Sequence, residues 1–213
     1  MKDPPMIDPA ALLIFVPIAL ALNLTPGADM LFCLGQGVRS GPSAGRAAAW
    51  GVAVGALIHT FAAGLGFAAF IAAHPVLFEV IRWAGVGYLV WLALQGLRYP
   101  ITTLEPTQVG RASVWGAFRR GVVVNVLNPK IALFFLALIP QFVEPDRGPI
   151  LLQFLIFGLI LNVGGTSINL VVGSLGGGFA RLLARNTGAA RALQYGTSAL
   201  FVMLAARLAL QPR

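Results

Sequence analysis

Asp29 and Lys130 are charged residues inside long apolar stretches, and each lies close to a proline. A charge within a membrane-length segment is costly, so such residues generally bind a substrate or carry an ion. An acid and a base at one site could bind a zwitterion, with the aspartate holding an ammonium group and the lysine a carboxylate. The two segments read Thr25-Pro26-Gly27-Ala28-Asp29 and Asn125-Val126-Leu127-Asn128-Pro129-Lys130.

Each of these segments also contains the sequence of a helix start. Thr25 precedes Pro26, and Asn128 precedes Pro129. Threonine and asparagine are N-cap residues, and proline is favoured at the first helical position. We therefore predict one helix break at Thr25, Pro26 and Gly27 and a second at Pro129, with a half-helix beginning at each proline. The free N–H groups at such a start would favour a carboxylate.

The depth of the two charges supports a shared site. Asp29 lies ten residues from Arg39, and Lys130 lies ten residues from Arg120, the arginines expected at the membrane border. At about 1.5 Å per residue this is roughly 15 Å, the middle of a hydrocarbon layer about 30 Å thick. Two alternatives stay open: the prolines could be simple kinks, and the two charges could form a structural ion pair.

Polar side chains in two other apolar segments extend the candidate site. Asn162, Thr166 and Asn169 are spaced by four and three residues, which places them on one face of a helix. Such a stripe either faces a cavity or joins helices by hydrogen bonds. His59 could relay protons, because imidazole changes charge near neutral pH, or it could be hydrogen-bonded in place. We expect Asn125, Asn162 and Asn169 to supply neutral hydrogen bonds to a substrate.

The composition indicates a membrane-spanning helical protein. The chain has 213 residues, 58% hydrophobic and 10% charged, whereas soluble domains carry about 25% charged residues. Its net charge of +8 comes from arginines in short links between apolar runs, which argues against a nucleic-acid-binding surface. Cys33 is the single cysteine, so an internal disulfide is excluded and no metal or other cofactor is expected.

Six apolar segments have the length of about 20 residues that a bilayer span needs. The longest link, 98–115, divides a single membrane domain (1–213) into repeat one (10–97) and repeat two (116–211). An offset of 103 residues lays Pro26 on Pro129 and His59 on Asn162. Three spans per half would give the halves opposite orientations, which predicts an all-α bundle of two inverted repeats. The predicted spans are Ala10–Gly35, Arg46–Ala72, Pro75–Leu97, Gly116–Pro140, Pro149–Leu175 and Arg191–Leu210.

The distribution of charge predicts the orientation in the membrane. Arginines cluster in the first, third and fifth links, whereas Glu79, Glu144 and Asp146 lie in or near the second and fourth. Positive links stay in the cytoplasm, so both termini should lie outside. Position 108 should then be accessible from the cytoplasm and position 146 from outside. We expect a multi-pass protein of the plasma (inner) membrane whose first span is retained and not cleaved as a signal peptide.

These motifs resemble the LysE/RhtB family of amino-acid exporters. The resemblance implies a six-span inner-membrane protein that expels amino acids or close derivatives in exchange for protons. An aspartate at position 29 resembles the homoserine/threonine/leucine branch of the family more than the lysine/arginine branch, which implies neutral substrates. Ala28 is a departure, because the family often has a second proline there. The resemblance is carried by the two segments given above and by Gly51-Val52-Ala53-Val54-Gly55, Gly85-Val86-Gly87-Tyr88-Leu89 and Pro140-Gln141-Phe142-Val143.

Our interpretation is therefore a secondary transporter in which Asp29 binds the substrate ammonium or carries the coupling proton. Lys130 and the two helix starts would bind the carboxylate. A permease for a metal ion or another small solute is the alternative on the same scaffold, although the clustered ligands that metal ions prefer are lacking. An enzyme is not expected, because the spans contain no Ser/His/Asp set or H-E-x-x-H string.

Two further possibilities concern partners. A non-transporting partner subunit would have the same composition but would move no solute in liposomes. Pairs of glycines spaced by four residues allow helices to approach closely, either within one chain or in a homodimer. These pairs are Gly51 with Gly55 and Gly173 with Gly177.

Overall fold

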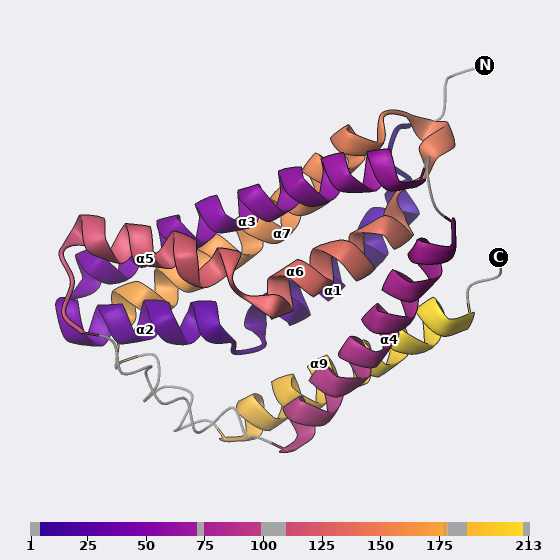
Figure 1. The fold of residues 1–213 in the computed structure, drawn as a ribbon. Coiled ribbons are helices and arrows are strands. Elements are labelled where there is room, and N and C mark those ends of the chain that lie inside the picture. Colours follow the sequence, from indigo (N-terminus) through magenta and orange to yellow (C-terminus); the bar gives the residue numbers. More distant parts are fainter. Residues whose placement is uncertain (1–4, 72–74, 99–109, 177, 179–186, 211–213) are drawn as a thin grey trace.

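The computed structural model describes residues 5–71, 75–98, 110–176, 178 and 187–210. Every regular element within these ranges is a helix (Figure 1), which confirms the all-α prediction. In chain order the elements are α1 (Pro9–Leu24), α2 (Ala28–Ser40), α3 (Pro42–Ile71), α4 (Pro75–Arg98), α5 (Val114–Val126), α6 (Pro129–Ala137), the short turns η2 (Ile139–Phe142) and η3 (Pro145–Arg147), α7 (Ile150–Leu175) and α9 (Thr187–Leu210).

The first and fourth predicted spans are each divided into two helices by a bend. The bend is 48° between α1 and α2, and 49° between α5 and the segment formed by α6 and η2. Proline explains both bends, because it has no N–H for the carbonyl four residues earlier and its ring clashes with that carbonyl. Residues 25–27 lie outside helix in the first break, and residues 127 and 128 in the second.

Two helices are long and apolar enough to cross a membrane, α3 over Pro42–Phe67 and α7 over Ile150–Leu175. The number rises to four if each bent pair is one span. The chain is thus a multi-pass helical membrane protein. The third and sixth predicted spans coincide with α4 and α9, but among the described residues α4 is strongly apolar only over Trp83–Gln95 and α9 does not reach that apolarity. The six-span arrangement therefore stays a prediction.

The helices α3 and α7 lie side by side along the bundle (Figure 1). The helices α2 and α5 pack against one half of this pair, and α1 and α6 contact the other half. A second pair, α4 with α9, lies on one side of the bundle, where α4 contacts α6 and α9 contacts α1. The start of α1 and the end of α9 lie at the same end of the bundle (Figure 1).

Glycines allow several of these helices to touch backbone to backbone. A Cβ atom at Gly173 of α7 would lie 2.6 Å from the carbonyl oxygen of Gly45 in α3, too close for any side chain. A Cβ atom at Gly51 would likewise overlap the backbone of Phe118 in α5. Gly51 and Gly173 are therefore used in contacts within the chain, whereas Gly177 lies outside the described residues.

Side chains of different size fill the two ends of the bundle. Near the start of α1, the rings of Phe15, Phe142 and Phe157 pack together, with centroids 4.8 Å apart for Phe15 and Phe157. At the other end, α2, α3 and α5 are packed through small buried residues. These include Cys33, Ala44, Ala48, Ala49 and Ala117.

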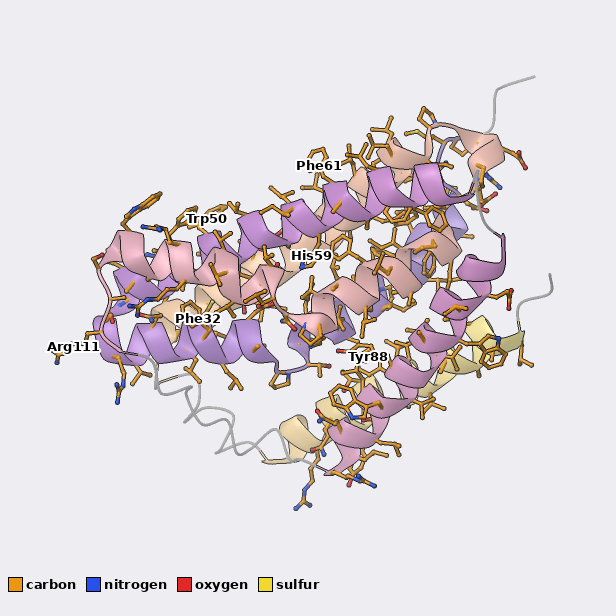
Figure 2. All side chains as sticks on the ribbon, viewed as in Figure 1. Phe32, Trp50, His59, Phe61, Tyr88 and Arg111 are labelled. Carbon is orange, nitrogen blue, oxygen red and sulfur yellow. The ribbon has the colours of Figure 1, made fainter. Side chains whose placement is uncertain are left out.

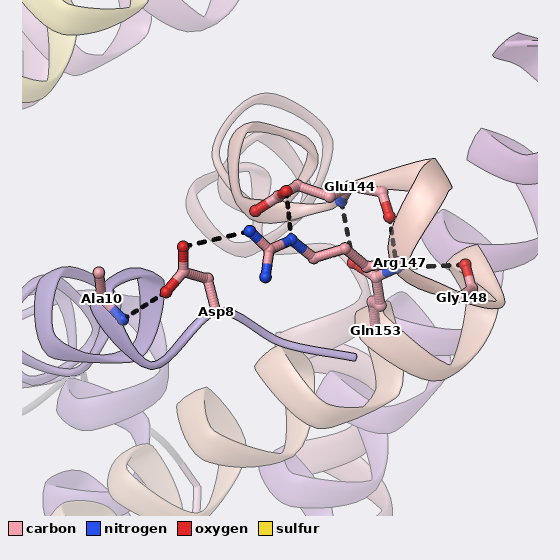
Figure 3. Close-up of polar contacts among 6 residues, drawn as sticks. All are labelled: Asp8, Ala10, Glu144, Arg147, Gly148 and Gln153. Carbon is pink, nitrogen blue, oxygen red and sulfur yellow. Dashed lines mark hydrogen bonds and ion pairs between the residues drawn. The ribbon is translucent and has the colours of Figure 1, made fainter. Parts of the chain in front are cut away.

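A polar network joins the start of α1 to the loop between α6 and α7 (Figure 3). Asp8 accepts hydrogen bonds from Ala10 N and, at 3.4 Å, from Arg147 Nη2, and Arg147 also pairs with Glu144. The buried Gln153 holds this loop by donating to the carbonyls of Glu144 and Gly148. The network therefore closes one end of the bundle between the first and second halves of the chain.

Large apolar side chains cover the outside of the bundle. Trp50 and Phe61 point away from α3 (Figure 2) and are 56% and 48% exposed. His59 belongs to the same helix but lies on the side that faces α5 and α6 (Figure 2). An apolar exterior of this kind is suited to contact with lipid.

Candidate functional site

Asp29 lies in the first turn of α2, directly after the first break, and is only 8% exposed. Its Oδ2 atom accepts a hydrogen bond of 2.9 Å from Asn125 Nδ2 of α5. Within the described part of the chain, its Oδ1 atom is buried and has no hydrogen-bond partner. A buried carboxylate oxygen without a donor is costly. This oxygen is therefore a place for a proton, a cation or the donor of a bound molecule.

Asn125 connects Asp29 to His59. Its backbone carbonyl lies 3.1 Å from His59 Nε2, and because a carbonyl oxygen only accepts, the imidazole donates this hydrogen bond. The His59 ring also stacks on Phe135 of α6, with centroids 6.1 Å apart. Gly55 leaves the room for Asn125, since a Cβ atom there would lie 2.7 Å from that of Asn125. His59 thus contacts the site through Asn125.

Lys130 lies in the first turn of α6, and its ammonium group points to the end of α1. Its Nζ atom donates hydrogen bonds of 3.1 Å to the carbonyl of Leu22 and 2.8 Å to that of Thr25. Among the described residues, no ion pair joins Lys130 to Asp29. The structural ion pair considered from the sequence is therefore not formed in this conformation.

The two breaks are capped differently. Asn128 caps α6 through a hydrogen bond of 3.0 Å from Lys130 N to its Oδ1 atom, which confirms the predicted N-cap. The prediction that Thr25 caps the next helix is wrong, because α2 begins only at Ala28, after Gly27. The hydroxyl of Thr25 instead donates to the carbonyl of Ala21, at 2.7 Å, and so belongs to the end of α1.

The predicted stripe on α7 is buried at the centre of the bundle. Asn162 Nδ2 donates to the carbonyl of Ala53 in α3 at 3.0 Å, and its Oδ1 atom accepts from the hydroxyl of Thr166 at 2.9 Å. Asn169 lines both cavities described below, and the structure gives its amide no hydrogen-bond partner among the described residues. Asn162 therefore joins helices, while Asn169 is available to a bound molecule.

Two small cavities of about 40 Å³ each lie on either side of Asp29. One extends along the breaks to Gly27, Asn128 and Lys130. The other extends to Asn125, Asn162 and Thr166 and is partly lined by apolar side chains such as Phe135. Each has room for one or a few water molecules. An amino acid would need the site to widen.

Asn23 is a site residue that the sequence analysis missed. Its side chain donates to the carbonyl of Leu161 in α7 at 3.0 Å and lies against Gly164 and Gly165, which have no side chain to exclude it. It lines both cavities. The available signal was an asparagine inside the first apolar stretch, two residues before Thr25.

The hydrogen bonds that assemble the site cross between the two halves of the chain. This holds for Asp29 with Asn125, Lys130 with Leu22 and Thr25, Asn162 with Ala53, His59 with Asn125, and Asn23 with Leu161. A polar site between two broken helices within an apolar bundle is typical of membrane transport proteins.

The sequence matches the model of the LysE type translocator family over residues 20–212. The chain belongs to this family, and it is a membrane translocator.

The chain is similar in sequence to two bacterial efflux proteins. It is 34% identical over 142 residues to the homoserine/homoserine lactone efflux protein of Salmonella typhi, covering 65% of this chain and 66% of that protein. It is 33% identical over 146 residues to the leucine efflux protein of Enterobacter sp. (strain 638), covering 68% of this chain and 69% of that protein. The chain thus spans about two thirds of the length of each relative. No solved structure matches it significantly.

Proposed function

We propose that this translocator exports neutral amino acids or close derivatives across the inner membrane in exchange for protons. The observation that carries the proposal is the unpaired, buried Oδ1 atom of Asp29 beside the cavities at the two breaks. The names of the two relatives, which refer to homoserine and leucine, support amino-acid substrates. Asp29 and Lys130 are the charged residues among the described lining of the cavities, so no additional charge is left for a charged substrate side chain.

Each polar group then has a role that fits its contacts. Asp29 binds the substrate ammonium in one state and a proton in the other, because both compete for the same carboxylate. Lys130 donates two of the three N–H bonds of an ammonium group to α1, which leaves one for the substrate carboxylate. Asn169 supplies a neutral hydrogen bond, and Asn125 holds Asp29 in place.

The purified protein in liposomes gives a direct test of export. With an inward-directed proton gradient, radiolabelled L-leucine or L-homoserine loaded inside should leave faster than from protein-free liposomes, and collapse of the gradient should slow the efflux. If neither leucine nor homoserine left the liposomes with the gradient present, the result would count against amino-acid export. No movement of any amino acid in a panel would instead favour a non-transporting partner subunit.

The arrangement of α4 and α9 suggests how the site is opened alternately to each side. If the chain crosses the membrane six times as two inverted repeats, α1 corresponds to α5 and α2 to α6. In the structure the α4/α9 pair packs on α6 and α1, and among the described residues no comparable packing joins α4 to α5 or α9 to α2. If each repeat adopted the conformation of the other, the α4/α9 pair would pack on α5 and α2 instead. The conformation described here would then be closed on the α1 side and ready to accept substrate from the α2 side.

A disulfide between α4 and α6 should lock this conformation. Gly85 of α4 lies directly against the Ala137 side chain of α6, so Gly85→Cys with Ala137→Cys should be oxidised readily after a small separation of the helices. With Cys33→Ala as background, we expect oxidation to reduce efflux to the level of empty liposomes and a reducing agent to restore it. Full transport by the oxidised protein would contradict movement of α4 away from α6.

The orientation proposed from the sequence places the α2 and α5 end in the cytoplasm and both termini outside. The structure places Arg111 close to the end of α2, where Ala112 N donates to Ser40 Oγ at 3.1 Å, and places Asp146 in η3 near the start of α1. Position 108 lies outside the described residues, so Arg111 is the better probe.

Cysteine labelling should distinguish the two possible orientations. Because Cys33 is fully buried, a Cys33→Ala background removes the native thiol. We expect an impermeant maleimide to label Asp146→Cys in intact spheroplasts and Arg111→Cys only after the membrane is opened. The reverse pattern would invert the topology and leave the site unchanged.

A further inference from the structure

Each proline at a break leaves one backbone carbonyl without its helical donor. In an α-helix the N–H of a residue donates to the carbonyl four residues earlier, and proline has no N–H. The helix α1 ends at Leu24 and Thr25 is extended, and with proline at position 26 the carbonyl of Leu22 has no helical donor. Pro129 likewise cannot donate to the carbonyl of Asn125, which instead accepts from the backbone three residues on. These two carbonyls lie at corresponding places in the two halves of the chain, inside apolar stretches where an unpaired carbonyl is costly.

A basic side chain from the opposite half donates to each of these carbonyls. Lys130 Nζ, from the second half, lies 3.1 Å from the oxygen of Leu22. His59 Nε2, from the first half, lies 3.1 Å from the oxygen of Asn125. The Asn125 oxygen also accepts from the backbone N–H of Asn128 at 2.9 Å, so its two lone pairs are both used.

The position of Lys130 is otherwise difficult to explain. A cation in the first turn of a helix is disfavoured by the positive end of the helix dipole. Lys130 occupies such a position in α6, but its ammonium group lies at the C-terminal end of α1, where the dipole favours a cation. The Lys130 side chain passes close to Gly27, where a Cβ atom would lie 3.4 Å from Lys130 Cδ and 3.5 Å from Nζ, in ordinary van der Waals contact.

We propose that Lys130 and His59 are reciprocal positioning residues, each capping the carbonyl that the proline of the other half releases. The two caps hold the broken helices together across the boundary between the halves. Lys130 holds the end of α1, beyond which α2 carries Asp29. His59 holds Asn125, which binds the Asp29 carboxylate. This role does not depend on which solute is transported, and it assigns His59 a hydrogen bond to the backbone in place of a proton relay.

A crossed set of double variants tests the proposal through the melting temperature of the purified protein. Lys130→Met should lower it by about 5 °C, because it leaves the carbonyl of Leu22 without a donor. His59→Leu should lower it by about 3 °C, because the carbonyl of Asn125 loses one of its two donors and keeps the N–H of Asn128. Pro26→Ala allows α1 to continue past Leu24, so that the N–H at position 26 can donate to Leu22, and it should reduce the shift caused by Lys130→Met to less than half. It should leave the shift caused by His59→Leu unchanged. Pro129→Ala should reduce the shift caused by His59→Leu and leave the shift caused by Lys130→Met unchanged. Each proline variant is thus the matched control for the other.

Conservative variants separate capping from general packing. Lys130→Arg and His59→Gln keep an N–H donor. Each should lower the melting temperature by no more than half as much as Lys130→Met or His59→Leu does. Spin labels at the exposed Leu13 of α1 and Leu136 of α6 (77% and 43% exposed), in the Cys33→Ala background, should show a broader distance distribution in Lys130→Met than in the parent.

Two results would overturn the proposal. One is an equal shift for Lys130→Met in the parent and in both proline backgrounds, since independent effects would simply add. The other is an unchanged melting temperature for either single variant. If Lys130→Met does not fold alone, recovery of folding by Pro26→Ala supports the cap, and failure to recover contradicts it. Loss of transport with the crossed pattern intact would concern the proposed export function and not the caps.

Discussion

Replacing Asp29 by Asn should abolish proton-driven efflux of amino acids while the protein still inserts and folds. Asparagine has nearly the same shape and can still accept the hydrogen bond from Asn125 Nδ2, but it cannot take up a proton or pair with an ammonium group as an anion. Removing a buried charge without a direct ion partner should change the melting temperature little or raise it. We expect gradient-driven efflux from liposomes to fall at least about 100-fold, because a loss of roughly 3 kcal/mol is typical when one partner of a buried charge interaction is removed.

The matched control is Asp146→Asn, which removes an exposed carboxylate far from the breaks. This variant should transport at nearly the parental rate. Undiminished proton-coupled efflux by Asp29→Asn would exclude Asp29 as both the ammonium site and the proton carrier. Facilitated exchange that persists without any response to the gradient would instead assign Asp29 to proton coupling alone.

Gly173→Ala should strongly destabilise the contact between α3 and α7. The added Cβ would lie 2.6 Å from the carbonyl oxygen and 2.8 Å from the carbonyl carbon of Gly45. Because these are backbone atoms, α3 and α7 can relieve the overlap only by separating. Overpacking of this kind costs about 1–3 kcal/mol, so we expect the melting temperature in detergent to fall by about 3–10 °C.

Gly66→Ala is the control, because Gly66 lies in α3 as well and a Cβ atom there has open space around it. Alanine has the higher helix propensity, so this variant should be at least as stable as the parent. Equal melting temperatures for Gly173→Ala and Gly66→Ala would show that α3 and α7 are not packed through their backbones.

The breaks could be predicted from the sequence because their cause is local. Proline removes a helical donor wherever it occurs, and Asn128 with Pro129 forms a cap within two residues. The Thr25 prediction failed because the same local reasoning cannot tell which of two adjacent helices receives the side chain. Its hydroxyl goes back to Ala21, and α2 starts two residues later than Pro26.

The contacts between the halves could not be predicted in the same way. Lys130 was expected to face a substrate carboxylate, and its bonds to α1 depend on how two segments about a hundred residues apart are placed in space. Asn23 was missed for the same reason, since its place in the site depends on the space that Gly164 and Gly165 leave on another helix. The sequence pattern indicated which polar residues lie inside apolar stretches, but not which partner each one has.

The backbone contact between Gly45 and Gly173 limits how α3 and α7 can move. With no side chains between them, neither helix can slide along or rotate about the other without steric overlap. Gly51 and Gly121 bring α5 equally close to α3, and Gly37 brings α2 equally close to α7, so these four helices should behave as one rigid body. Any change of shape during a transport cycle is then left to the segments attached to this body through a break or a loop, namely α1, α6, α4 and α9.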